Sequence, residues 1–215
     1  MLRAGCYKPR TSPYSFQGLG KEGLKLLALM RERYGLVIIT EARDATHIDD
    51  VIAYSDIIQV GSKAMFDQGI LRAAAQGGKP VMIKRFFGAS LQEFLQASEF
   101  ILCQGNTEVM LCERGIRSFE TKTRFTLDLC SVAYLKQHSN LPIVVDASHA
   151  MGYAYGVPDL LRASAAMGIE GLMVEIHPNP PKALSDAQQQ LRPQQLSQEL
   201  DSVDAILKAI QRKRI

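Results

Sequence analysis

Basic side chains recur at or just beyond the ends of apolar runs in this 215-residue sequence. Several cations in one partly desolvated pocket are tolerable when an anion such as phosphate or carboxylate neutralises them. For any one of these residues taken singly, a solvated loop charge is an equal alternative. Together they predict a site for a small molecule with two or three negative charges. The six residues are Arg3, Lys8, Arg10, Lys63, Lys84 and Arg114.

A second set combines one imidazole with two carboxylates, those of His149, Glu175 and Asp186. Nitrogen and oxygen ligands of this kind suit a divalent metal ion. A single histidine is more often a hydrogen-bonded structural residue, and Asp186 could cap a turn, so spacing alone leaves both interpretations open. His177 lies two residues beyond Glu175 and would share its face of a strand. It could support a metal ligand or contact a phosphate.

Short apolar runs that alternate with helical patterns must position these side chains. The expected strands cover 2–7, 37–40, 57–61, 80–85, 108–112, 141–146 and 171–177. The expected helices cover 23–33, 48–54, 66–75, 91–102, 125–137, 160–167 and 197–212, with a long loop at 179–195. The clearest helix, 91–102, follows a capping box formed by Ser90 and Glu93.

Uniformly apolar strands that alternate with helices predict an α/β fold with a parallel sheet, either an open doubly wound sheet or a closed barrel. A (β/α)₈ TIM barrel has eight strands and typically about 250 residues. Seven strands and a closing helix therefore favour a TIM-barrel type that lacks its first strand and helix. Side chains at strand carboxyl ends point into the mouth of such a barrel, which would gather both sets of residues.

Bulk properties exclude several classes of protein. The 25 basic and 22 acidic residues are scattered, without the basic stripe that binding to nucleic acid or a membrane surface favours. No apolar run approaches the roughly 20 residues that span a bilayer. The four cysteines form no C-x-x-C pair, and the amino terminus has no export signal. We expect one cytoplasmic catalytic domain over 1–215, without a separate regulatory domain.

The run from Arg3 to Gly18 contains Lys8-Pro-Arg-Thr-Ser12 and resembles the K-P-R-T-S signature of 3-deoxy-arabino-heptulosonate 7-phosphate (DAHP) synthases. The sister 3-deoxy-octulosonate 8-phosphate synthases carry K-A-N-R-S there, so the resemblance implies erythrose 4-phosphate rather than arabinose 5-phosphate as the aldehyde. The likeness covers nearly the whole chain, through Thr40-Glu41, Ile58–Gly61, Lys84-Arg85, Leu111–Glu120, Thr126–Asp128, Val145–His149, Val174–Pro178 and Lys182–Asp186.

The resemblance implies a metal-dependent transferase that condenses phosphoenolpyruvate with erythrose 4-phosphate, the first step of the shikimate pathway to aromatic amino acids. C3 of phosphoenolpyruvate would attack the aldehyde, water would add at C2 and phosphate would depart. The metal, Mn, Fe, Zn or Co, would polarise the aldehyde oxygen, while the cationic side chains would stabilise developing charge. Lys8 would deliver a proton, and we expect Lys8 and His149 to be the catalytic residues.

The resemblance also assigns the binding residues. The metal would be held by His149, Glu175 and Asp186. Phosphoenolpyruvate would bind Arg3, Lys8, Lys84 and Arg114, and the aldose phosphate would bind Lys8, Pro9, Arg10, Thr11 and Ser12. We add Lys63, Glu113 and His177 to the substrate site.

The chain departs from the family pattern at several positions. Family barrels begin with a strand that ends in Gly-Pro-Cys-Ser, whose cysteine is a fourth metal ligand, and this motif has no counterpart in the sequence. Cys6 lies out of phase with Arg3, so we expect a buried structural thiol there; Cys103 and Cys130 are expected in the core. Lys63 replaces an arginine and loses its planar fork, and Tyr153 also stands where the family has arginine.

Three hypotheses follow. The chain is a DAHP synthase, which we expect to form a homo-oligomer. Alternatively, it is a catalytically impaired paralogue that binds phosphoenolpyruvate or a sugar phosphate, or that associates with an intact synthase. The third hypothesis is a barrel remnant that folds poorly alone, because a closed sheet has lost a strand.

Overall fold

The computed structural model describes residues 1–8 and 12–214, which form two compact units, Met1–Leu111 and Cys112–Ile215. The alternation of strands and helices expected from the sequence is confirmed. A doubly wound sheet reverses its strand order at a switch point, whereas this sheet keeps chain order throughout, as in a barrel. The strands are β1 (Leu2–Arg3), β2 (Ile38–Ala42), β3 (Ile57–Val60), β4 (Val81–Lys84), β5 (Val109–Glu113), β6 (Ile143–Asp146) and β7 (Gly171–Met173).

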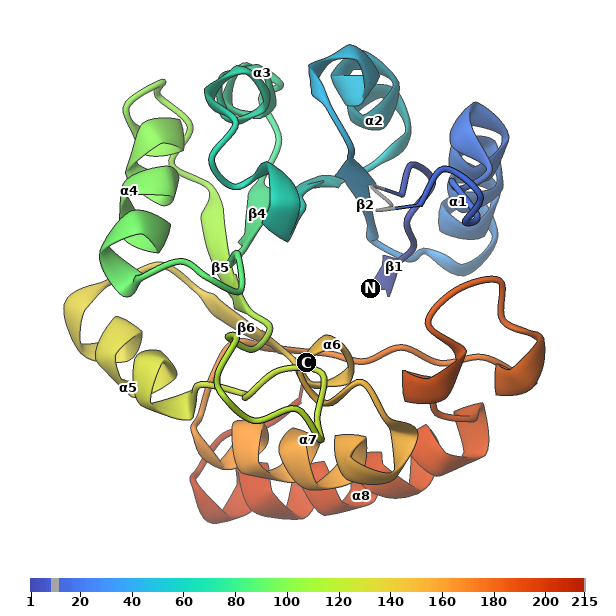
Figure 1. Cartoon of the computed structure of the whole chain (residues 1–215), viewed down its shortest axis with the longest axis vertical. Coiled ribbons are helices and arrows are strands. Elements are labelled where there is room, and N and C mark those ends of the chain that lie inside the picture. The colour runs from blue at the N-terminus through green and yellow to red at the C-terminus, as the bar shows by residue number, and fades with distance from the viewer. Residues whose placement is uncertain (9–11, 215) are drawn as a thin grey trace. The chain divides into compact units, whose positions relative to one another are not determined.

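The first unit carries four parallel strands, β1 to β4, with Leu2 paired to Ile38, Ile39 to Ile57 and Ile58 to Val81. Its helices lie on one face of these strands (Figure 1). The predicted capping box of α4 is confirmed, since Ser90 and Glu93 bond each other's backbone N–H groups. The helices are α1 (Gly20–Tyr34), α2 (Ile48–Tyr54), α3 (Gln68–Gln76) and α4 (Leu91–Leu102).

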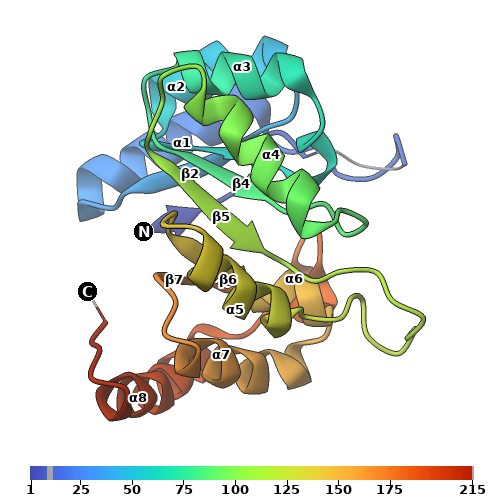
Figure 2. The same cartoon turned by 90° about the vertical axis from the view of Figure 1, so that its left-hand side faces the viewer.

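The second unit contains the parallel pair β6 and β7, and α7 and α8 lie side by side (Figures 1 and 2). A buried cluster of Ala147, Val157, Leu161 and Leu191 holds α6 and α7 together. The longest described helix, α8, has 17 residues, and none of the described helices is both long and apolar enough to cross a bilayer. The helices are α5 (Leu129–His138), α6 (Ala147–Met151), α7 (Val157–Ala166) and α8 (Pro193–Ala209).

Three expectations from the sequence are wrong. β7 ends at Met173, so Glu175 and His177 lie beyond the strand. The expectation that both side chains share one face of that strand therefore does not hold. The stretch 179–195 is not one long loop, because it holds two short 3₁₀ turns and the start of α8. Cys103 and Cys130 are exposed rather than in the core, since Cys103 caps the end of α4 and Cys130 lies on the outer side of α5.

Candidate active site

Three potential metal ligands gather in the second unit. One ligand atom each from His149, Glu175 and Asp186 lies within 4.8 Å of the other two. His149 belongs to α6, Glu175 follows β7 by two residues, and Asp186 precedes the 3₁₀ turn at Ala187–Gln189. Their side chains are 12%, 16% and 12% exposed, so a bound ion would be partly shielded from water. The structure thus brings together the set that the sequence proposed.

His149 is held by the aspartate that begins its own helix. Asp146 is fully buried at the end of β6 and caps α6, where its Oδ1 accepts a hydrogen bond from the His149 backbone N–H at 3.0 Å. Its Oδ2 lies 2.8 Å from Nδ1 of the imidazole. A carboxylate facing Nδ1 places the ring proton there and leaves the Nε2 lone pair for a metal. Nε2 is the ring nitrogen that faces the cluster, and it lies 3.8 Å from Oε1 of Glu175.

Glu175 and Asp186 are fixed by local contacts. The backbone N–H of Glu175 donates to Oγ of Ser148 at 2.9 Å, and its Oε2 accepts from Nε2 of Gln189 at 2.7 Å. Asp186 has a φ of 54° and a ψ of 30°, in the left-handed region. That conformation costs a residue with a side chain roughly 1 kcal/mol or more and is often found at functional sites. The strained backbone directs this carboxylate toward the cluster.

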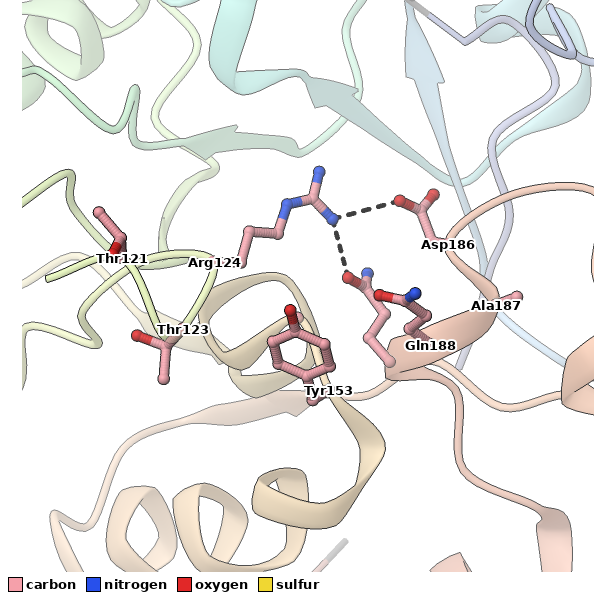
Figure 3. Close-up of a pocket in the computed structure, with 9 residues that line it drawn as sticks. Thr121, Thr123, Arg124, Tyr153, Asp186, Ala187 and Gln188 are labelled. Atoms are coloured by element: carbon pink, nitrogen blue, oxygen red, sulfur yellow. Dashed lines mark hydrogen bonds and ion pairs between the residues drawn. The ribbon is translucent and has the colours of Figure 1, made fainter.

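Arg124 also contacts these carboxylates and was not anticipated from the sequence. Its Nη1 donates to Oδ1 of Asp186 at 3.2 Å and to Oε1 of Gln189 at 2.8 Å, as Figure 3 shows. These residues line a pocket of about 480 Å³ together with Thr121, Thr123, Gly152, Tyr153, Ala187 and Gln188. Asp146 and Gln189 were likewise given no role. Arg124 and Gln189 lie outside the regular elements that periodicity can detect, which explains the omission.

The donor set fits a divalent transition metal. One imidazole nitrogen and two carboxylates are ligands that Mn, Fe, Zn and Co accept. The carboxylate 2.8 Å from Nδ1 takes the place of the outer partner that metal-bound histidines usually have. The hydrogen-bonded group of Glu175, Asp186 and Arg124 carries a formal charge of −1, which a cation would further neutralise.

A buried arginine in the same unit has the character of an anion site. Arg114 is 4% exposed, and within the described chain its Nε and Nη1 have no hydrogen-bond partner. Its guanidinium lies 4.3 Å from the ring centre of Phe125. Burial lowers the pKa of Arg114, although the charge of Asp146 opposes that effect. A cation held away from water is costly unless it is paired, so an anionic ligand would stabilise it.

The first unit contains a hydrogen-bonded network around Arg3. Its Nη2 lies 2.9 Å from Oε2 of Glu41, and its Nε donates to Oε1 of Gln59 at 2.9 Å. Gln59 in turn donates to Oε2 of Glu41 at 2.7 Å. A Cβ at Gly61 would lie 1.9 Å from Oε1 of Glu41, so glycine is needed to make room for this carboxylate. The network holds Arg3 in one orientation.

The other residues predicted to bind substrate differ in their exposure to solvent and in their hydrogen bonds. Lys84 at the end of β4 is 4% exposed, and Glu113 is fully buried with Oε1 accepting from the Gly115 N–H at 2.6 Å. Lys63 is exposed in a 3₁₀ turn after β3. Nδ1 of His177 accepts from the Asn179 N–H at 3.0 Å, and His177 lies outside the ligand cluster.

The K-P-R-T-S motif is described only at its two ends. Lys8 is half-buried and donates its backbone N–H to the Gln17 carbonyl at 2.9 Å, while Oγ of Ser12 accepts from the Tyr14 N–H at 3.3 Å. Pro9, Arg10 and Thr11 lie outside the described residues. Cys6 is buried among Leu24, Leu27 and Ile38, which agrees with the expected structural thiol.

Comparisons with known proteins identify the relatives of this chain. The model of the DAHP synthetase I family matches residues 1–212. The phospho-2-dehydro-3-deoxyheptonate aldolase of Thermotoga maritima is 48% identical over 89% of this chain. The 2-dehydro-3-deoxyphosphooctonate aldolase of Stenotrophomonas maltophilia is 34% identical over 82% of this chain and 67% of its own length.

The crystal structure of the Thermotoga maritima DAHP synthase superposes with a TM-score of 0.94 at 42% identity, over 98% of this chain and 61% of that one. This agreement confirms the expected α/β fold of TIM-barrel type. The chain spans 56% of the length of the curated Thermotoga relative. On the match over residues 1–212, the chain belongs to the DAHP synthetase I family.

Proposed function

We propose that this chain acts as a DAHP synthase, a metal-dependent transferase that condenses phosphoenolpyruvate with erythrose 4-phosphate in the first step of the shikimate pathway. The observation that carries the proposal is the gathering of His149, Glu175 and Asp186 within 4.8 Å in a member of this family. The higher identity to the heptonate aldolase than to the octonate aldolase, 48% against 34%, favours the four-carbon aldehyde.

Substrate binding rests on cations that the fold keeps from water. We assign the carboxylate and phosphate of phosphoenolpyruvate to Arg3, Lys84 and Arg114, of which Lys84 and Arg114 are each 4% exposed. Guanidinium groups bind such anions through paired N–H donors. The two unpartnered nitrogens of Arg114 are available for this role. The aldose phosphate is assigned to the motif from Lys8 to Ser12.

The chemistry assigned to the chain is charge stabilisation and proton transfer. The reaction forms a bond from C3 of phosphoenolpyruvate to the aldehyde carbon, adds water at C2 and releases phosphate. Arg114 and Lys84 stabilise the negative charge that moves between these groups. Lys8 donates a proton to the oxygen of the former aldehyde. His149, Glu175 and Asp186 would hold a divalent ion, which would supply Lewis acidity in the site.

Phosphate release measured with both substrates tests this function. The purified chain is assayed with phosphoenolpyruvate, erythrose 4-phosphate and each of Mn²⁺, Fe²⁺, Zn²⁺ and Co²⁺, with EDTA as the control. We expect turnover that requires the metal and falls strongly when arabinose 5-phosphate replaces erythrose 4-phosphate. Absence of turnover with all four ions contradicts the proposal. Calorimetric binding of phosphoenolpyruvate without turnover would instead support the impaired paralogue.

We further propose that residues 1–215 work as one catalytic domain within a cytoplasmic homo-oligomer. The mass of the particle in solution, measured by light scattering after size exclusion, tests the oligomer. A mass near the 23.8 kDa of one chain contradicts it.

A further inference from the structure

Arg124 is built into the segment that carries His149. Its backbone N–H donates to the Met151 carbonyl at 3.1 Å, and the next N–H donates to the Ala150 carbonyl at 2.9 Å. Both acceptors belong to α6. A Cβ at Gly152 would lie 2.5 Å from the Cβ of Arg124, and Gly152 has a φ of 77°. The glycine therefore permits both the local conformation and the close approach of this arginine.

The guanidinium of Arg124 is linked to both carboxylates of the cluster. It contacts Asp186 directly at 3.2 Å. It reaches Glu175 through Gln189, whose Oε1 accepts from Arg124 at 2.8 Å and whose Nε2 donates to Glu175 at 2.7 Å. Gln189 is 2% exposed, so this bridge is protected from water. One side chain thus supplies positive charge to the two acids that would hold the metal.

Arg124 contacts Oδ1 of Asp186 and would compete with a divalent ion for that oxygen, because like charges repel in a partly desolvated site. We propose that Arg124 is a displaceable counter-cation of the metal centre. Arg124 positions Asp186 and, through Gln189, Glu175; a bound ion would displace it from Oδ1 of Asp186. The pocket of about 480 Å³ that Arg124 lines offers room for the released side chain, beside Thr121, Thr123 and Tyr153 (Figure 3).

This inference rests on the proposed metal centre, and calorimetric titration with Mn²⁺ tests it without reference to activity. We expect Arg124→Met to bind Mn²⁺ about tenfold more tightly than the wild type, because the ion then need not displace the guanidinium and one repulsion is removed. Arg124→Lys keeps the charge and should retain wild-type affinity. Lys122→Gln removes a positive charge two residues earlier in the same loop, at a residue that does not line the pocket, and should change little.

Thermal unfolding supplies a second readout. Without metal, Arg124→Met loses the ion pair with Asp186 and the hydrogen bond to Gln189, so its Tm should be below that of the wild type. A ligand stabilises the folded state more as its affinity rises, so the increase in Tm on adding Mn²⁺ should be larger in the variant. If Arg124→Met does not fold, Arg124→Gln replaces it, since the amide keeps a hydrogen-bonding group while removing the charge.

The possible failures are distinguishable. Unchanged or weaker Mn²⁺ binding by a folded Arg124→Met or Arg124→Gln overturns the inference and leaves the metal centre in place. An equal gain in affinity for Lys122→Gln also overturns it, because the effect would then reflect net charge alone. A wild type that binds none of Mn²⁺, Fe²⁺, Zn²⁺ and Co²⁺ overturns the inference together with the proposed centre.

Discussion

Each unit of the molecule contains a network of arginine, glutamine and glutamate, and the two networks differ in charge. In the first unit Arg3, Gln59 and Glu41 bond to one another, and one cation matches one anion. In the second unit Arg124 and Gln189 contact two carboxylates, those of Asp186 and Glu175, with the imidazole of His149 beside them.

This difference separates a network that orients a cationic side chain from one that offers metal ligands. In the first network the acid, Glu41, contacts the guanidinium of Arg3, so that network does not favour a metal ion. The second network has a formal charge of −1 and an imidazole nitrogen oriented by Asp146 toward the cluster. Similar residue types can therefore serve different roles. One acid with one base fixes a side chain, whereas two acids with one base and an imidazole nitrogen can attract a metal ion.

The largest expected effect follows from removing that nitrogen. His149→Ala should weaken Mn²⁺ binding by more than about 100-fold, because changing even an outer partner of a metal ligand costs 10- to 100-fold. Calorimetry measures the loss directly. His138→Ala is a matched control, because His138 is exposed, stacks on Tyr134 and does not belong to the ligand cluster. Retained affinity in His149→Ala would remove this histidine from the proposed centre.

Asp146→Asn should produce a smaller loss. Asparagine caps a helix as well as aspartate does, so α6 should persist, but the amide is a weaker acceptor for the Nδ1 proton of His149. We expect Mn²⁺ affinity to fall by roughly 10- to 100-fold. Asp128→Asn makes the same change at the cap of α5, where Asp128 accepts from the Ser131 N–H. If both variants lose affinity equally, the orienting role of Asp146 is wrong.

Breaking the matched pair in the first unit should affect stability rather than metal binding. Glu41→Gln removes the carboxylate charge that contacts the guanidinium of Arg3, a side chain that is 15% exposed. Removing one partner of a buried pair is strongly destabilising, and partial exposure reduces the expected cost to about 2 kcal/mol. Urea unfolding measures this value, while Mn²⁺ affinity should stay unchanged. Glu22→Gln, which breaks an exposed pair with Lys25, should cost much less than Glu41→Gln.

Much of the fold was predictable because most strands are short, mainly apolar runs and helices such as α2 and α4 carry clear periodic or capping signals. The end of β7 was not predictable. Val174 to His177 continues to alternate, but Ile176 pairs with Leu191 through an isolated bridge outside the strand. Pairing with a distant segment determines where that strand ends, and this information is not local.

The site was predictable by residue type but not in its supporting contacts. His149, Glu175 and Asp186 carry the chemistry of metal ligands, but their spacing left a structural role open, and the family resemblance singled them out as a set. Arg124 meets Gln189 across 65 positions of sequence, and hydrogen bonds to α6 fix its loop. α6 has five residues, too few to show a helical period.

The smallest expected effect concerns Cys6, in the core beside the Arg3 network. Burial raises the pKa of the Cys6 thiol, although Thr40 and the charge of Arg3 oppose the shift. The folded state then keeps the thiol proton at a pH where the unfolded chain releases it. The stabilisation is complete below pH 9.0, the ordinary pKa of the unfolded thiol, and is lost as the pH rises toward the folded pKa.

Urea unfolding between pH 7 and 10 should therefore show a shallower alkaline decline in stability for Cys6→Ala than for the wild type. Cys130→Ala, at an exposed site, should follow the wild-type slope, and parallel curves for all three proteins would show that Cys6 titrates alike in both states.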